Sequence, residues 1–193
     1  MKKVLFIMVI LLLVASPKAD ACVGKVLTIG AVNSSEGQVL AEMLSSLINE
    51  RTGTTIAVKF FKNEQELYDA VKVNQVEISI ENTTKAMQAL NKPVDTDVNK
   101  TYEFVKAVYE KDKGMVWLKP FGFMHSNGDA SPSYTAAVLR VEVLNNFPAL
   151  PRVIGKLGNL LNDEIRSKLI RSVESGEQPK KAARDFLKSK KLI

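Results

Sequence analysis

The sequence predicts an α/β fold, in which a mainly parallel sheet carries helices on both faces. Two consecutive strand–helix units followed by a third strand support this prediction, because such an order is typical of parallel strands joined by right-handed crossovers. Short apolar, β-branched runs alternate with segments whose apolar residues recur at helical spacing, which distinguishes strands from helices. About 170 residues after the N-terminal leader suffice for one domain with its own core.

The first unit begins with residues 26–32, an apolar run that is long enough for a buried strand and too short for a helix. Three short polar residues follow, and they can accept hydrogen bonds from the free N–H groups that begin a helix. Apolar residues recur at helical spacing over residues 39–48, and Gly53 stands where a glycine ends a helix. The turn lies at the carboxyl end of a strand, where open α/β sheets bind ligands.

Two further strands follow the first helix. Residues 54–61 alternate and are rich in β-branched residues, so they are expected to form the second strand, and Asn63 is expected to cap the next helix. Residues 76–80 read as a third strand, and residues 81–84 then repeat the polar strand-to-helix turn. If the strands are parallel, this turn lies on the same rim as residues 33–36.

The rest of the chain is expected to complete the sheet and to cover it. A long helix is predicted over residues 98–113, because Gly114 follows it and apolar residues fall on one side. Residues 115–118 and 134–141 are β-like runs, separated by an extended Gly-Phe segment and turn-rich residues. Four helical segments are predicted after them, at residues 144–147, 151–157, 163–173 and 179–190.

The first 21 residues are interpreted as a secretory signal peptide. Two lysines form a basic region, residues 4–14 are an unbroken apolar run, and Ala19-Asp20-Ala21 offers small residues at the cleavage positions. An uncleaved membrane anchor is the alternative, but this apolar run is shorter than the ~20 residues of a bilayer span. We therefore expect an exported protein, in the periplasm or another extracytoplasmic compartment, with residues 22–193 as a single domain.

Cys22 is the only cysteine, and it would be the first residue after cleavage. A lone cysteine excludes an intramolecular disulfide and a structural zinc site built from cysteines. At this place it could instead carry the lipid of a bacterial lipoprotein, although Asp20 fits such a signal poorly. Soluble export and a lipid anchor at Cys22 both stay open.

Composition and motifs argue against nucleic-acid binding and catalysis. The net charge is +6, and lysines cluster only near the C-terminus, which is typical of a solvated helix end. The single histidine, His125, lies in a polar turn and is expected to be exposed and idle, and no phosphate loop or metal-ligand spacing occurs. The candidate acids Glu36, Glu42, Glu81 and Asp129 are not paired by their spacing. We expect no enzyme, no cofactor, no metal and no nucleic-acid partner.

Three segments at predicted strand ends form the candidate site: residues 33–36, 81–84 and 121–134. Two helix N-termini on one rim would favour an anionic group such as a carboxylate. The alternative is that both turns serve only as helix caps. Trp117 and Phe123 are expected to pack in the core rather than to cage a cation, although Trp is the best cation–π partner.

Four parts of the chain match one family pattern across nearly the whole sequence after residue 21. They are residues 29–36 with 40–44 and 52–53, residues 77–83, residues 114–123, and residues 132–137 together with 179–187. The pattern resembles the quaternary-amine class of ABC transporter substrate-binding proteins, which bind glycine betaine or choline and are OpuAC-like. The run Val-Trp-Leu-Lys-Pro-Phe-Gly-Phe at residues 116–123 is the most specific part.

The resemblance implies one lobe of a type II periplasmic-binding-protein-like fold and a non-catalytic function in transmembrane transport. It implies a quaternary-amine ligand, an osmoprotectant such as glycine betaine or choline, and an ABC permease as partner. The positions expected to bind the ligand are Asn33, Ser34, Ser35, Glu36, Asn82, Thr83, Phe123 and Tyr134.

The chain also departs from the family pattern. The family builds a second lobe where this chain has only residues 124–131, and Asn82 and Thr84 replace a tyrosine and a glycine of the family. One aromatic wall for a quaternary ammonium is therefore missing, and the cleft is expected to be half open. A homodimer or another protein could cover it. The alternative function is a protein-interaction module that uses the former cleft face and binds no small ligand.

Overall fold

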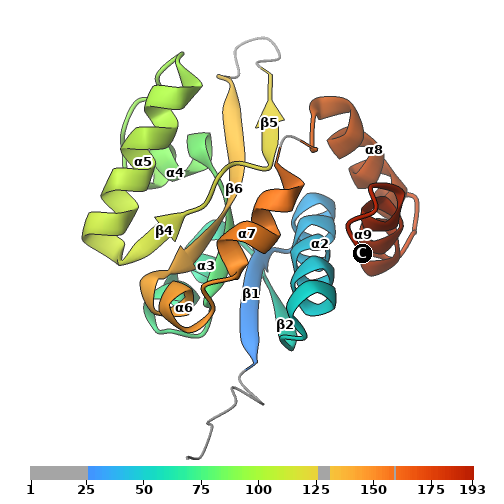
Figure 1. The fold of residues 1–193 in the computed structure, drawn as a ribbon. Helices are drawn as coiled ribbons and strands as arrows, with labels where there is room; N and C mark the ends of the chain where they lie inside the picture. Colours follow the sequence, from blue (N-terminus) through green and yellow to red (C-terminus); the bar gives the residue numbers. More distant parts are fainter. Residues whose placement is uncertain (1–25, 126–130, 159) are drawn as a thin grey trace, which may run out of the picture.

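The computed structural model describes residues 26–125, 131–158 and 160–193. Their strands form one six-stranded sheet in the order β2-β1-β3-β6-β4, with β5 also paired to β6 (Figure 1). The strands are β1 (Leu27–Val32), β2 (Ile56–Phe61), β3 (Ile78–Asn82), β4 (Met115–Trp117), β5 (Gly122–Met124) and β6 (Ser133–Arg140). The predicted signal peptide, Cys22, and most of the short connection at residues 124–131 lie outside the described residues.

The sheet is mainly parallel, as predicted. Strands β2, β1 and β3 run parallel to one another, whereas β6 runs antiparallel to β3, β4 and β5. Five of the six described strands therefore point the same way, and β6 alone runs against them. The carboxyl ends of β1 and β3 lie at one edge of the sheet, which is the edge where the sequence places its polar turns.

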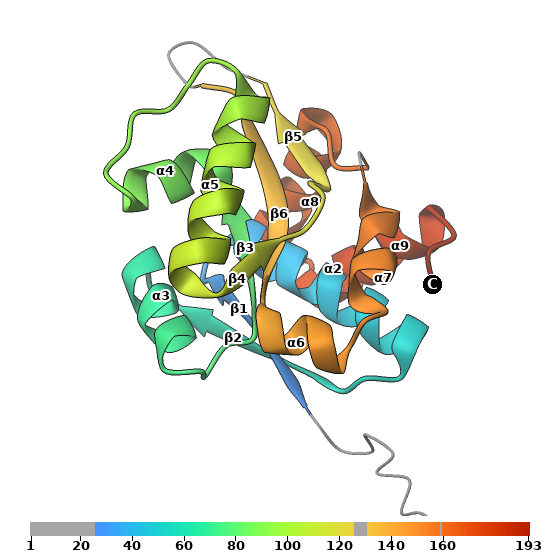
Figure 2. The same cartoon turned by 60° about the vertical axis from the view of Figure 1, so that its left-hand side comes forward.

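Helices cover both faces of the sheet, which confirms the predicted layers (Figures 1 and 2). Helices α3, α4 and α5 pack on one face, and α2 with the C-terminal helices packs on the other. The helices are α2 (Ser35–Thr52), α3 (Glu64–Lys72), α4 (Thr83–Ala89), α5 (Val98–Lys113), α6 (Val141–Asn146), α7 (Leu150–Ile154), α8 (Asp163–Glu174) and α9 (Pro179–Ser189), with a short 3-10 turn at Gly155–Leu157.

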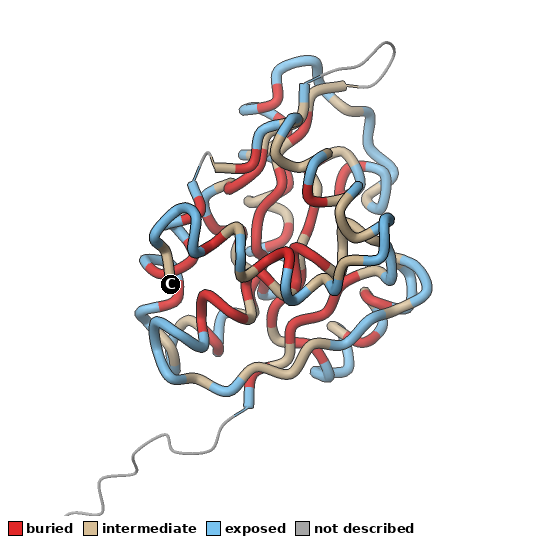
Figure 3. Tube along the Cα trace, turned by 90° about the vertical axis from the view of Figure 1, so that its right-hand side faces the viewer, coloured by how far each residue is buried: buried red, intermediate tan, exposed pale blue. Residues whose placement is uncertain are grey.

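The largest core cluster lies between α2 and the sheet. Leu27, Ile29 and Ala31 of β1 are buried there with the apolar face of α2. Strand β6 serves both layers, because alternate residues of a strand point to opposite faces: Ala137 and Leu139 join this cluster, while neighbouring residues of β6 join the cluster under α5. Figure 3 shows these buried segments running through the middle of the molecule. This packing fixes the start of α2 relative to the sheet.

The first strand–helix unit forms as its sequence predicts. The Ser34 side chain accepts a hydrogen bond from the Gly37 N–H, and α2 continues to Thr52. Gly53 ends the helix at a φ of 70°, and its N–H donates to the Asn49 carbonyl. A left-handed residue is cheap for glycine, so the predicted stop is confirmed.

Strand β3 lies later in the chain than predicted. It begins at Ile78 rather than at residue 76, and it includes Glu81 and Asn82. These two polar residues remain in the strand because β6 pairs with them, Glu81 opposite Ala136 and Asn82 opposite Thr135. Long-range pairing of this kind overrides local preference. Helix α4 consequently begins directly at Thr83.

The turn-rich stretch is also shorter than predicted, because Met124 and Ser133 pair with each other at the ends of β5 and β6. At the other end of β6, Val141 begins α6 rather than ending the strand. Among the helices of the described residues, none is both long and apolar enough to cross a membrane.

Candidate functional site

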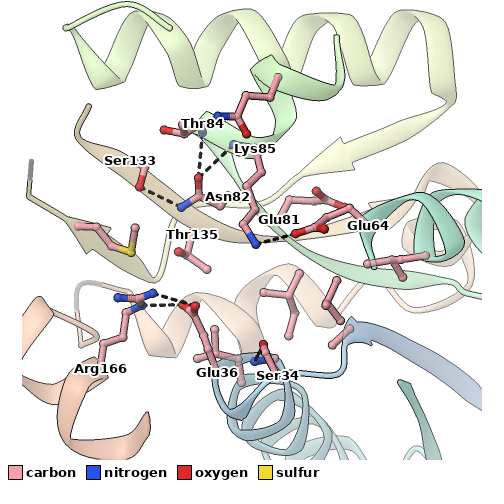
Figure 4. Close-up of a pocket in the computed structure, with 18 of the residues that line it drawn as sticks. Ser34, Glu36, Glu64, Glu81, Asn82, Thr84, Lys85, Ser133, Thr135 and Arg166 are labelled. Carbon is pink, nitrogen blue, oxygen red and sulfur yellow. Dashed lines mark hydrogen bonds and ion pairs between the residues drawn. The ribbon is translucent and has the colours of Figure 1, made fainter. Parts of the chain in front are cut away.

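A cleft of about 520 Å³ opens at the carboxyl ends of β1 and β3 (Figure 4). One wall is the start of α2, the opposite wall is the start of α4, and Arg166 reaches in from α8. The polar and charged residues that line it are Ser34, Glu36, Glu64, Glu81, Asn82, Thr84, Lys85, Gln88, Ser131, Ser133, Thr135 and Arg166.

The wall at α2 carries an ion pair. Glu36 lies in the first turn of α2 and accepts two hydrogen bonds from Arg166, with Nε–Oε1 and Nη2–Oε2 distances of 2.6 and 2.7 Å. Both side chains are about one-third exposed or less. The hydrogen bonds to Glu36 raise the pKa of the Arg166 guanidinium above its ordinary value. This pair ties α8 to the start of α2 and places both signs of charge at the cleft.

The wall at α4 is organised by Asn82. Its Oδ1 accepts hydrogen bonds from the backbone N–H groups of Thr84 and Lys85, and its Nδ2 donates to Ser133 Oγ at 2.9 Å. An amide is suited to this double role because it accepts and donates at once. Both predicted turns therefore cap helices, and Asn82 also joins α4 to β6.

A second ion pair crosses the cleft margin. Lys85 Nζ in α4 lies 2.7 Å from Glu64 Oε1 in the first turn of α3. The hydrogen bond from Lys85 lowers the pKa of Glu64 below its ordinary value. Each acid at the rim thus has a basic partner, and the lining alternates in charge rather than carrying one sign.

The floor of the cleft holds two buried polar groups. Glu81 is 5% exposed, and its Oε2 accepts a hydrogen bond from the Tyr68 hydroxyl at 3.0 Å. Burial raises the pKa of Glu81 to about 7. Thr84 Oγ1 also lines the cleft, and it is a buried hydroxyl without a hydrogen-bond partner in the described structure. A buried polar atom of this kind is normally satisfied by water or a ligand.

The structure brings together only some of the residues expected to bind a ligand. Ser34, Glu36 and Asn82 line the cleft. Five others do not belong to its lining: Asn33, Ser35, Thr83, Phe123 and Tyr134. Asn33 accepts a hydrogen bond from the Gln38 side chain, and the buried Thr83 hydroxyl accepts one from the Tyr134 N–H.

The aromatic residues form a cluster outside the cleft. Tyr134 lies between Phe123 and Tyr102, with ring-centroid distances of 5.5 and 5.9 Å. Trp117 is 2% exposed and packs edge-on against Tyr102, so its predicted place in the core is confirmed. Within the described residues that line the cleft, none is aromatic. A cation in the cleft would be held by carboxylates instead.

His125 is exposed, as expected, and it contacts another element of the fold. Its backbone N–H and its ring Nδ1 both approach Asp163 Oδ2, at 3.1 and 2.8 Å. Asp163 is the first residue of α8. The histidine therefore ties the end of β5 to the helix that supplies Arg166.

Sequence reasoning missed three charged residues of the cleft: Glu64, Lys85 and Arg166. Each lies in the first turn of a helix that the sequence predicts, so the helix starts were the available signal. The pairing was not visible, because Arg166 and Glu36 are 130 residues apart. Only the folded sheet brings these helix starts to one edge.

Comparisons with known proteins agree with this architecture. The family model described as the substrate binding domain of ABC-type glycine betaine transport systems matches residues 25–137, which is more than half of the chain. A search of curated proteins finds no match.

Solved structures share the fold at low sequence identity. A crystal structure of a glycine betaine/carnitine/choline ABC transporter aligns with a TM-score of 0.74 and 16% identity, over 87% of this chain and 98% of the other. Apo YehZ from Escherichia coli aligns with a TM-score of 0.76 and 12% identity, over 88% and 100%. Closed, glycine betaine-bound lactococcal OpuAC gives a TM-score of 0.52 and 8% identity, over 86% and 96%.

Proposed function

Because the chain belongs to the family of substrate-binding domains of ABC-type glycine betaine transport systems, we propose that its cleft binds a zwitterionic quaternary amine, with glycine betaine as the first candidate. Choline and carnitine are the related candidates. The protein then acts as a non-catalytic, extracytoplasmic binding component that delivers its ligand to an ABC permease.

The alternating charge of the cleft is the observation that carries this proposal. Glu36 with Arg166, and Glu64 with Lys85, present both signs at opposite walls. A zwitterion can place its carboxylate near a basic member and its quaternary ammonium near an acidic one. A simple cation or anion would meet a charge of its own sign at either wall, which disfavours it.

The size of the cleft also suits such a ligand. Small-molecule sites in proteins commonly measure roughly 300–1,000 Å³, and this cleft measures about 520 Å³. The unpartnered Thr84 hydroxyl offers a donor for a ligand carboxylate.

We expect weak binding. No aromatic side chain lies among the described lining residues, so the cation–π attraction, worth up to ~2 kcal/mol in a dry site, is missing. The ion-paired side chains must also give up their present partners before they can contact the ligand. A dissociation constant in the millimolar range, corresponding to about −4 kcal/mol, is the expected result.

The missing aromatic wall favours a second candidate function, the interaction module. In this alternative the ion pairs at the cleft stay intact, and the cleft face binds a protein, most simply a second copy of the chain. A homodimer would cover the half-cleft without requiring any small ligand.

Isothermal titration calorimetry of the purified protein with glycine betaine tests the first proposal. Arg166→Met should weaken binding by about tenfold to a hundredfold, since one charge-assisted contact is worth about 1.5–3 kcal/mol. Arg171→Met, on the same helix but outside the cleft lining, should leave it unchanged. Choline, which lacks the carboxylate, should bind more weakly than glycine betaine and should respond less to Arg166→Met.

Absence of saturable heat at tens of millimolar glycine betaine, choline and carnitine would overturn the small-ligand proposal. Sedimentation velocity then tests the second candidate. A dimer that Glu36→Arg dissociates, and that Glu42→Arg on the same helix leaves intact, would support an interaction face at the cleft.

A further inference from the structure

A second pocket, of about 400 Å³, lies between α3, α5 and the sheet. Figure 2 shows these two helices on the same face of the sheet, opposite α2. Glu81 is the only residue that lines both this pocket and the cleft among the described residues. Its lining also includes Tyr68, Ser79, Tyr109 and Lys113, together with the charged residues Lys72, Asp112, Arg140 and Glu142.

The pocket contains oxygen atoms that lack partners. Ser79 and Tyr109 are each 1% exposed, and neither buried hydroxyl makes a hydrogen bond of full geometry in the described structure. The Ser79 hydroxyl still lies close enough to Glu81 to lower the pKa of that carboxyl, against the larger effect of burial. Strand β3 directs Ser79 and Glu81 to this face, because they are two residues apart. Glu81 accepts one hydrogen bond, from Tyr68, and a carboxylate can accept several. The lining is therefore rich in unused acceptor capacity.

The chain itself shows which charge these walls attract. Lys113, at the end of α5, places its ammonium 4.0 Å from the ring centroid of Tyr109 and 5.4 Å from that of Tyr68. Ring faces attract cations at such distances. Two tyrosines and a buried acid thus line this pocket, and the ammonium of Lys113 already lies beside them.

We propose that this pocket is a second ligand site, which takes a small primary ammonium ion and in which Lys113 is the intramolecular competitor. A primary ammonium offers three N–H donors, which match acceptors on Glu81, Ser79 and Tyr109. A quaternary ammonium offers none and would leave those oxygens unpaired. The second site should therefore distinguish its ligand from the quaternary amine proposed for the cleft.

Calorimetric titration of the purified protein with methylammonium chloride, against sodium chloride at the same ionic strength, tests this proposal. Saturable binding should appear with methylammonium and not with tetramethylammonium. Lys113→Met should strengthen binding by about threefold to tenfold, because it frees the ring face of Tyr109 and removes a competing charge. Lys72→Met is the matched control: Lys72 lines the same pocket but pairs with Asp69, and its loss should change affinity less than twofold.

At about pH 8, where Glu81 is mostly ionised, Glu81→Gln should weaken methylammonium binding by about tenfold or more, because it removes the buried charge while it keeps the shape of the side chain. Trp117 supplies an optical readout, since its ring lies 5.5 Å from that of Tyr109. Saturating glycine betaine should leave methylammonium binding in place, which separates this site from the cleft.

Three results would overturn the proposal. One is the absence of saturable methylammonium binding in both the natural protein and Lys113→Met, which would mean that water satisfies the hydroxyls. Another is an equal gain in methylammonium affinity from Lys72→Met and Lys113→Met, which would mean that the gain comes only from the change in net charge. The third is equal binding of tetramethylammonium. The two lysine variants keep the test decisive even if Glu81→Gln fails to fold.

Discussion

At the scale of single residues, Glu81 is a group whose chemistry depends strongly on the fold. It is a carboxylic acid in a strand, almost fully buried, and it accepts a hydrogen bond from Tyr68. Burial disfavours its charged form and raises the pKa to about 7. The acid is therefore partly protonated near neutral pH, and it sits where the cleft and the second pocket meet.

This pKa predicts how stability changes with pH. The native pKa of Glu81 lies above the ordinary value of 4.5, so the native state binds more protons than the unfolded state between these values. Its contribution is therefore fully present below about pH 4.5 and is lost as pH rises through about 7. The loss should amount to about 3 kcal/mol at most. Urea unfolding of the natural protein and Glu81→Gln across this window measures it.

Both proteins contain the same other acids, so subtracting one unfolding free energy from the other removes the contribution of those acids. As pH rises, Glu81→Gln should become more stable relative to the natural protein. A difference that stays constant from pH 4.5 to 8 would show that Glu81 ionises in the native state as readily as in the unfolded state.

Asn82 carries a second prediction at this scale. Asn82→Ala removes a helix cap and the bond to Ser133, so it should cost about 1–2 kcal/mol of unfolding free energy. Asn63→Ala removes the cap of α3, where the side chain accepts from the Glu66 N–H, and should cost less. Equal costs in thermal unfolding would mean that the bond from Asn82 to Ser133 adds nothing.

At the scale of elements, the start of α2 holds one wall of the cleft in a tight turn. A Cβ on Gly37 would lie 2.1 Å from the Val32 carbonyl oxygen, which is backbone and cannot swing away. Gly37→Ala should therefore destabilise the protein by about 2 kcal/mol or more, as overpacking does. At Gly155, also in a helical turn, nothing lies within 4 Å of such a Cβ.

Gly155→Ala is accordingly the matched control and should be neutral or slightly stabilising. Chemical denaturation of both variants gives the comparison. If Gly37→Ala proves as stable as the natural protein, the turn that shapes this wall is looser than its geometry indicates.

Helices and caps were the most predictable elements. Helix α5 has the predicted bounds, residues 98–113, because its apolar face and terminal Gly114 are local signals. Strand β3 was placed too early because its pairing with β6, more than fifty residues away, decides where it ends. Local periodicity contains no information about such partners.

The difference between local signals and long-range packing also decides which residues of the candidate site could be predicted. Ser34, Glu36 and Asn82 could be predicted, since each follows or ends a strand at the rim. Arg166 could not, because its place depends on how α8 packs beside α2. Phe123 and Tyr134 were expected at the ligand, and the structure places them in an aromatic cluster outside the cleft lining. That ligands bind at the predicted positions remains a prediction.

At the scale of the whole molecule, one sheet lies between two helical layers (Figures 1 and 2). A cleft opens at one edge of the sheet, and a second pocket lies beneath one layer. The described residues supply charged walls for the cleft and no aromatic lining for it. A family member with this lining should rely on charge pairing, and its ligand affinity should fall as salt rises, since screening weakens partly exposed pairs.

The most direct test of the central claim is a ¹H–¹⁵N NMR titration of the protein with glycine betaine. If the cleft binds it, the largest shift changes will occur at the amides of residues 34–37, 82–85 and 133–135, and they will saturate in the millimolar range. Unchanged spectra, or changes confined to residues outside the cleft, would contradict the claim.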